Sequence, residues 1–122
     1  MNTIPRVAIK LPEFDTGQYE GCEFHMSEGN ALLVLHLAGL PQFKIRFQRV
    51  RWHRYTQLYS CDETWVRDAY FRLIEVNQAE LLNDFVQSDR SHQKAYKELH
   101  HFRIFLDETG CHEVFAEAAF SA

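Results

Sequence analysis

The sequence predicts an α+β fold, in which an antiparallel sheet of about five or six strands carries one or two short helices packed on it. Two observations lead to this prediction. Several segments alternate apolar and polar residues with the period of half-buried strands, and turn-forming residues separate them. One segment near residue 80 instead places apolar residues at helical intervals. The 122 residues fit a single domain, residues 1–122, around one core.

The composition is that of a globular protein, because 46% of the residues are hydrophobic, too many for a disordered chain. The formal net charge of -4 argues against a general nucleic-acid binder. The three cysteines form no CxxC pair, the N-terminus has no signal-peptide pattern, and the longest apolar stretch is too short to span a bilayer. We therefore expect a reduced, cytoplasmic protein with no membrane partner.

The first elements are expected to be an irregular segment through Gly21 and then a β-hairpin. The segments "GCEFHM" and "ALLVLHLAG" flank "SEGN", in which Glu28, Gly29 and Asn30 tolerate positive φ angles in a tight turn. In the second hairpin strand both faces are mostly apolar, which is typical of a central strand. The next turn is "LPQF".

The stretch "FKIRFQRVRWHRYTQ", residues 43–57, is expected to be a strand rich in cations. Its cations are Lys44, Arg46, Arg49, Arg51 and Arg54. Phe43, Ile45 and Phe47 alternate with polar residues and are predicted to face the core, so that Lys44 and Arg46 face outward. The alternation breaks near Val50, where a β-bulge or bend would restore an apolar inner face.

The second half is expected to alternate helical segments with strands. "SCDETWVRD" predicts a turn or a short helical segment, and "AYFRLIEV" predicts a strand. Asn77 then caps a short amphipathic helix, with Glu80 at capping-box spacing. The polar "SDRSHQKAYKELH" is a loop or a second helix. Two strands, "HFRIFL" and "CHEVFAEAAF", close the chain around "DETG", with Gly110 in a left-handed turn position.

Histidines and cysteines suggest a metal site or a nucleophile, but their spacing argues against both. The close pairs are Cys22 with His25, His100 with His101, and Cys111 with His112. In strands the members of each pair point to opposite faces, and the sequence has no HExxH, paired CxxC or nucleophile-elbow motif. Glu113 and Glu117 share a strand face, and we interpret them as solvated residues. We therefore expect no metal, no cofactor and no enzymatic activity.

Charges separate along the chain. Residues 11–42 and 74–89 contain no Lys or Arg, whereas residues 43–57 contain no Asp or Glu. If the basic strand lies beside an acidic segment, the charges compensate across the sheet. Two alternatives stay open: a small nucleic-acid-binding module that uses the basic strand, and a ligand-binding or enzymatic domain with a histidine-lined pocket. Exposure of Trp52 and Tyr55 would favour the nucleic-acid alternative.

Four segments in this order carry a family resemblance. They are "LPQFKIRFQRVRWHRY", "AYFRLIEV", "NQAELLNDFVQSD" and "LHHFRIFLDETGCHEVFAEAAF". This arrangement resembles the small bacterial immunity proteins that protect a cell from its own polymorphic or contact-delivered toxins, over roughly residues 30–120. The resemblance implies a cytoplasmic, non-enzymatic antitoxin that binds one cognate toxin and occludes its active site.

Many delivered toxins attack nucleic acid and are themselves basic, so acidic side chains would steer the association of such a toxin with this protein. The expected contact residues are Glu23, Glu28, Glu75, Glu80, Asp84 and Asp89. Aromatic anchors would supply most of the affinity. Nucleic acid is not expected as a partner, and a homodimer is compatible with the sequence.

Overall fold

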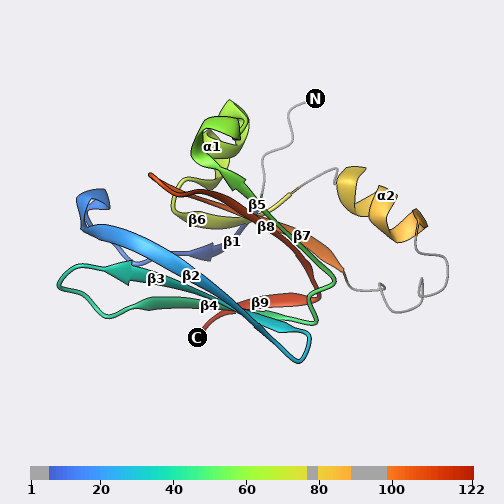
Figure 1. The fold of residues 1–122 in the computed structure, drawn as a ribbon, viewed down its shortest axis with the longest axis horizontal. Coiled ribbons are helices and arrows are strands. Elements are labelled where there is room, and N and C mark those ends of the chain that lie inside the picture. The colour runs from blue at the N-terminus through green and yellow to red at the C-terminus, as the bar shows by residue number, and fades with distance from the viewer. Residues whose placement is uncertain (1–5, 77–79, 89–98) are drawn as a thin grey trace.

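The computed structural model describes residues 6–76, 80–88 and 99–122 (Figure 1). Within these ranges the chain forms nine strands in two antiparallel sheets, together with two α-helices. The predicted α+β class and the antiparallel pairing are confirmed. The strands divide between two stacked sheets, however, where the sequence predicted one sheet of about five or six strands.

The two sheets stack face to face as a sandwich. On each of its two open sides, one edge strand of one sheet lies beside one edge strand of the other. The five-stranded sheet has the order β1-β6-β7-β8-β5, and the four-stranded sheet has the order β2-β3-β4-β9. The strands are β1 Arg6–Lys10, β2 Tyr19–Ser27, β3 Asn30–Leu37, β4 Phe43–Gln48, β5 Trp52–Gln57, β6 Arg72–Glu75, β7 His100–Leu106, β8 Gly110–Ala116 and β9 Ala118–Ser121. Edge strands β1 and β9 contact one another, and β2 meets β5 on the other side through a ring stack of Phe24 on His53.

Both predicted turns with left-handed residues are present. The β2–β3 hairpin turns at Glu28 and Gly29, whose φ angles are 53° and 81°. Strand β3 lies between β2 and β4, so its prediction as a central strand is confirmed. Gly110 starts β8 with a φ of 135°, and a Cβ atom there would collide with the backbone carbonyl of Thr56 on β5. Only glycine fits both requirements at this position.

The basic stretch is not one strand, which corrects the prediction for residues 43–57. It consists of β4 in the four-stranded sheet and β5 in the five-stranded sheet. Arg49 between them has a left-handed φ of 54°. The Val50 N–H donates to the carbonyl of Gly29 at 2.7 Å, and the Arg51 N–H donates to the carbonyl of Phe115 at 2.9 Å. The chain thus crosses between the sheets where the apolar alternation breaks.

Two further predictions need correction. The segment before Gly21 is not wholly irregular, because it contains β1 and the first residues of β2. The tail predicted as one strand breaks at Glu117, whose N–H donates to the carbonyl of Gln48 at 2.9 Å. Strand β8 therefore ends in one sheet and β9 begins in the other. Two single-turn 3-10 helices complete the described elements, η1 Thr16–Gln18 and η2 Leu58–Ser60.

Helix α1, Glu63–Ala69, lies on the face of the five-stranded sheet that points away from the other sheet (Figure 1). The Asp62 side chain caps it by accepting a hydrogen bond from the Thr64 N–H at 2.9 Å. Trp65 and Val66 pack against Phe105 of β7 and its neighbours. The short helical segment predicted there is confirmed. The strand predicted for "AYFRLIEV" is shorter, β6, since Ala69 belongs to α1 and Phe71 has a left-handed φ of 49°.

Helix α2, Glu80–Ser88, lies beyond the end of β7 and β8 in Figure 1. Its Phe85 ring meets the Phe115 ring at 5.3 Å between centroids. The predicted cap at Asn77 lies outside the described residues, as do residues 89–98 of the loop or helix predicted for residues 88–100. Of that segment, Ser88 ends α2 and His100 begins β7. No helix in the described part of the chain is long and apolar enough to cross a membrane.

The core lies between the two sheets and follows the predicted strand faces. Its fully or nearly fully buried side chains include Leu33, Leu35, Ile45 and Phe47 from the four-stranded sheet, and Phe102, Ile104, Leu106 and Val114 from the five-stranded sheet. Phe47 and Ile45 are 1% and 0% exposed, which confirms the inward face predicted for β4.

Candidate functional site

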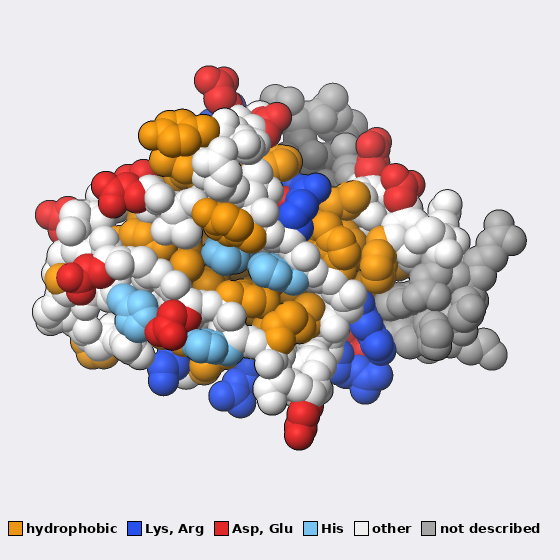
Figure 2. All heavy atoms as spheres, in the orientation of Figure 1, with side chains coloured by type: hydrophobic (Ala, Val, Ile, Leu, Met, Phe, Trp, Pro, Cys, Tyr) orange, Lys and Arg blue, Asp and Glu red, His pale blue; other side chains and the backbone are white. Residues whose placement is uncertain are grey.

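The open side of the sandwich between β2 and β5 brings together side chains from three strands. We call this surface the β2–β5 rim. Its residues are Cys22, Phe24 and Met26 of β2, His53 and Tyr55 of β5, and His112 of β8. They meet because alternate residues of a strand share a face. In Figure 2, pale-blue histidine and orange hydrophobic side chains adjoin one another across the middle of this face of the molecule.

A chain of close contacts holds the rim together. The Phe24 ring stacks on the His53 ring with centroids 3.9 Å apart. The Nε2 atom of His53 lies 3.4 Å from Nδ1 of His112. The other nitrogen of His112, Nε2, lies 3.6 Å from Sγ of Cys22. His112 thus uses both ring nitrogens, and the three groups form a line instead of converging on one point.

Two tyrosines brace one end of the rim. The Tyr55 hydroxyl donates to the backbone carbonyl of Thr109 at 2.5 Å, and the Tyr19 hydroxyl lies 2.8 Å from the Thr109 side-chain oxygen. Both rings are therefore fixed on the β7–β8 turn. Tyr55 is nevertheless 48% exposed, so about half of its surface is open to solvent.

The rim carries no charge at neutral pH. Burial, helped by the nearby His53, lowers the pKa of His112 to about 4. Burial also lowers the pKa of His53 and raises the pKa of the Cys22 thiol. A nucleophilic cysteine needs a lowered thiol pKa, whereas burial raises that of Cys22. The chemistry of the rim therefore fits non-covalent contact.

The neutral state of His112 predicts acid lability. In the unfolded chain the imidazole binds a proton near pH 6.5, whereas the folded chain resists protonation down to about pH 4. The contribution of His112 to the free energy of unfolding is therefore fully present above pH 6.5. It is lost as the pH drops to 4, which lowers the stability by about 3 kcal/mol. Urea unfolding between pH 7 and pH 4 measures the loss.

The matched variants are His112→Gln and His25→Gln, since His25 is an exposed histidine outside the rim. The first should reduce the pH dependence between 6.5 and 4 by the share of His112, leaving the part that His53 and His101 contribute through their own lowered pKa values, and the second should leave it unchanged. A wild-type stability that stays constant from pH 7 to pH 4.5 would contradict this assignment.

A second polar cluster lies on the outer face of the five-stranded sheet. Glu113, in the middle of β8, is 0% exposed. Its cross-strand partners in register are Arg54 on β5 and Arg103 on β7. Arg54 donates to Oε1 at 2.6 and 3.1 Å, Arg103 donates to Oε2 at 3.0 and 3.2 Å, and His101 donates to Oε2 at 2.7 Å. The carboxylate is thus the common acceptor for three side chains.

The cluster keeps Glu113 ionised and His101 neutral. Burial alone would raise the pKa of Glu113, but the hydrogen bonds from His101 and Arg54 and the charge of Arg103 lower it to about 2. Burial lowers the pKa of His101, against the opposing effect of Glu113. Its Nε2–H then donates to the carboxylate, and its buried Nδ1 has no hydrogen-bond partner among the described residues.

The interpretation of Glu113 as a solvated residue is therefore wrong, and Glu117 is also engaged, in an ion pair with Arg49 at 2.8 Å. One signal in the sequence marks Glu113: it shares its strand face with Cys111 and Phe115, which are buried. A carboxylate on a buried face requires cationic partners. The rim contact between Cys22 and His112 had no such signal, because the two residues are 90 positions apart.

The predicted acidic contact residues of the second half lie in different surroundings. Glu80 and Asp84 are exposed on α2 and have no ion pair among the described residues. Glu75 is partly buried and accepts from His100 at 2.7 Å, with Arg6 at 3.9 Å. Asp89 lies outside the described residues.

The two predicted acids of the first hairpin also differ. Glu23 is bonded to His36 at 2.5 Å and to His25 at 3.2 Å, and the bond from His36 lowers the pKa of Glu23. Glu28 is exposed in the turn and forms no ion pair within the described part of the chain. The structure thus leaves Glu28, Glu80 and Asp84 available to a partner.

The five cations of residues 43–57 do not form one surface. Lys44 and Arg46 point outward from the four-stranded sheet, Arg49 pairs with Glu117, Arg51 lies in the crossing, and Arg54 binds the buried Glu113. Trp52 is half-buried, with its ring stacked on Phe115 at 4.2 Å, whereas Tyr55 is exposed. Binding of single-stranded nucleic acid requires a continuous basic groove with aromatic side chains on which bases stack. These five cations do not form such a groove.

The predicted divergence of the Cys and His pairs is confirmed by their contacts. Cys22 approaches His112 while His25 approaches Glu23 on the other face. His100 bonds Glu75, and His101 bonds Glu113. Cys111 packs beneath α1, away from the rim. Among the described residues no three metal-ligating side chains converge.

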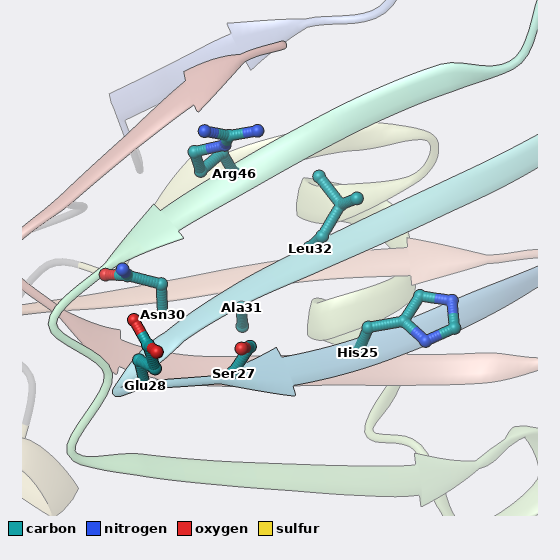
Figure 3. A pocket seen from close by; sticks show the side chains of 7 residues that line it. All are labelled: His25, Ser27, Glu28, Asn30, Ala31, Leu32 and Arg46. Atoms are coloured by element: carbon teal, nitrogen blue, oxygen red, sulfur yellow. The ribbon is translucent and has the colours of Figure 1, made fainter.

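A hollow of about 340 Å³ lies on the outer face of the four-stranded sheet (Figure 3). His25, Leu32 and Arg46 reach it from three neighbouring strands, and Glu28 reaches it from the hairpin turn. It contains one histidine, while His53 and His112 lie at the rim. The histidine-lined pocket considered from the sequence is therefore not formed at this hollow.

Comparison with known proteins identifies no relative of this chain: no family profile, no curated protein and no solved structure matches it. Function is therefore inferred from the side chains described above. In the rim and in the Glu113 cluster, residues distant in sequence form organised polar and aromatic contacts.

Proposed function

We propose that the protein is an immunity protein, which binds and neutralises a cognate toxin without catalysis and contacts it through the β2–β5 rim. The observation that carries this proposal is the exposure of large side chains at and beside the rim. Met26 is 52% exposed, Tyr55 is 48% exposed, and Tyr59 of η2, directly after β5, is 90% exposed. Tyrosine and methionine are enriched in protein interfaces, and aromatic anchors carry much of the binding energy.

The rim is suited to association because it is fixed and uncharged before a partner arrives. The Phe24–His53 stack and the Tyr55–Thr109 hydrogen bond restrict the side chains that a partner would touch. Less rotamer entropy is then lost on binding. Neutral imidazoles also cost less to remove from water than imidazolium ions would.

Exposed acidic side chains favour a basic partner. A toxin that attacks nucleic acid would be such a partner. Glu80 and Asp84 are exposed on α2 and are not neutralised by described cations. Their field acts over distance, so they accelerate the encounter even where they do not touch the partner. Tyrosine anchors at the rim would then slow dissociation and hold the toxin with its active site occluded.

Co-expression with the toxin encoded beside this gene tests the proposal. The wild-type protein should restore growth and form a complex, and the double variant Tyr55→Ala, Tyr59→Ala should raise the dissociation rate by at least about tenfold. Tyr70→Ala, at an exposed tyrosine outside the rim, is the matched control. Lack of both protection and complex formation refutes the immunity function. Unchanged dissociation in the double variant refutes the rim as its surface.

Charge reversal on α2 should slow association. Glu80→Lys with Asp84→Lys removes the exposed acids of the helix, and we expect the association rate to fall about tenfold at low ionic strength. Stopped-flow mixing at two salt concentrations measures the rate and its salt dependence. The fold should persist, since both side chains are exposed.

The control makes the same change in net charge elsewhere. Glu13→Lys with Glu20→Lys alters exposed acids near η1, at the opposite end of the molecule from α2 in Figure 1. Equal slowing in both double variants would mean that only net charge matters. No slowing in either would refute the predicted steering.

A further inference from the structure

The Glu113 cluster has unequal numbers of opposite charges. Two guanidinium groups, of Arg54 and Arg103, share the single carboxylate of Glu113. His101 contributes no charge, because burial lowers its pKa. Within the described residues, neither arginine has a second ion-pair partner. The cluster therefore holds one surplus positive charge.

The surplus charge faces solvent at Arg54. The Arg54 side chain is 40% exposed, whereas Arg103 is 13% exposed and Glu113 is buried. Asp62, at the start of α1, lies within electrostatic range of Arg103 but forms no ion pair with it. An anion approaching from solvent therefore meets the Arg54 guanidinium first.

Glu113 fixes the orientation of that guanidinium. Its Oε1 atom accepts from Nε and Nη2 of Arg54, which leaves Nη1 on the other edge without a hydrogen bond among the described residues. A planar guanidinium held along one edge presents its remaining donors in a defined direction. Such an arrangement suits an oxyanion, which accepts parallel N–H donors.

Tryptophan rings flank the same group. The guanidinium carbon of Arg54 lies 5.4 Å from the Trp52 ring centroid and 5.6 Å from that of Trp65. Trp65 also lies 4.6 Å from the guanidinium carbon of Arg103. The indole rings exclude water from the faces of the guanidiniums and strengthen an ion pair formed at their edge. In Figure 2, basic and hydrophobic side chains adjoin one another between α1 and α2.

We propose that Arg54, positioned by Glu113 and flanked by Trp52 and Trp65, is a binding site for a carboxylate. The carboxylate belongs either to a small free acid or to an acidic side chain of a protein partner, and both present the same group to the guanidinium edge. This site lies on the outer face of the five-stranded sheet and is separate from the toxin contact proposed for the β2–β5 rim.

Intrinsic fluorescence reports this site directly, because Trp52 and Trp65 are the two tryptophans of the chain. Iodide, an anionic quencher, and caesium, a cationic one, are each normalised to their quenching of N-acetyltryptophanamide, because iodide quenches free indole more efficiently. The normalised Stern–Volmer constant of iodide should be about threefold that of caesium, since one local charge changes ion concentrations by that order. We call this excess the preference for iodide. The net charge of -4 would by itself favour caesium, so a preference for iodide is local.

Competition and variants complete the test. Sodium acetate or a hexaglutamate peptide, at constant ionic strength made up with sodium chloride, should remove the preference for iodide. Arg54→Gln should abolish it, and Arg46→Gln, at an exposed arginine of the other sheet, should retain it. Near-ultraviolet circular dichroism checks that Arg54→Gln is folded.

The outcomes decide the proposal and the source of the ligand. If acetate removes the preference for iodide, the ligand is a free small acid. If only the peptide removes it, the ligand is an acidic side chain of a partner. Equal normalised quenching by iodide and caesium in the wild-type protein overturns the proposal, whether or not the variant folds. A preference that neither acetate nor the peptide removes, or that persists in folded Arg54→Gln, also overturns it.

Discussion

Replacing Glu113 by glutamine should lower the free energy of unfolding at pH 7 by about 3–5 kcal/mol, as expected when one partner of a buried ion pair is removed. The carboxylate accepts from Arg54, Arg103 and His101, and the neutral amide would leave two half-buried guanidiniums without a counter-charge. The lowered pKa of about 2 points to the same magnitude, since a shift from the usual 4.5 corresponds to about 3 kcal/mol.

The pH dependence of this effect distinguishes it from a packing defect. A carboxyl group with a lowered pKa stabilises the fold above pH 4.5 and loses that contribution as the pH falls toward 2. The gap between wild type and Glu113→Gln should therefore narrow below pH 4.5 in urea unfolding. Glu117→Gln, in the partly exposed pair with Arg49, should change stability by less than about 1 kcal/mol. A similarly small effect for Glu113→Gln would contradict the role assigned to the cluster.

Phe47→Ala should destabilise the fold by about 3–5 kcal/mol, the usual cost of truncating a buried phenylalanine. Phe47 is 1% exposed, and its ring lies 6.5 Å from the Phe24 ring and 6.0 Å from the Phe102 ring of the opposite sheet. Its loss therefore opens a cavity between the two sheets. Chemical denaturation at pH 7 measures the change.

Lys44→Ala is the control for Phe47→Ala, since Lys44 lies on the same strand and faces outward. It forms no ion pair among the described residues, so its loss should change stability by less than about 1 kcal/mol. If both substitutions had equal effects, β4 would not have the inward and outward faces described here.

Local patterns in the sequence predicted a substantial part of the fold. The alternation of Phe43, Ile45 and Phe47 identified the buried face of β4, and the Glu28–Gly29 pair identified the hairpin turn. These predictions succeed because side-chain parity and backbone φ preferences are properties of a few adjacent residues. The turn or short helical segment predicted for "SCDETWVRD" is helix α1, whose cap at Asp62 is seen in the structure.

The assignment of strands to sheets was not contained in those patterns. The sequence predicted a bulge or bend near Arg49 and an unbroken strand through Glu117. At both positions the chain instead crosses from one sheet to the other. A break in alternation predicts where a strand ends or bends. It does not predict with which strand the next segment will pair. That choice depends on hydrogen bonds between residues far apart in the sequence, such as the bond from the Glu117 N–H to the carbonyl of Gln48.

The candidate sites show the same division. Helix and strand periodicity alone predict the exposed acids of α2 and the opposed directions of the Cys and His pairs. The contact of Cys22 with His112 and the position of Glu113 between Arg54 and Arg103 follow instead from the pairing and stacking of distant strands. The physical reason is that the ionisation of a carboxylate or imidazole depends on which charges and apolar groups surround it, and strands β2, β5, β7 and β8 supply those neighbours only after the sandwich has closed.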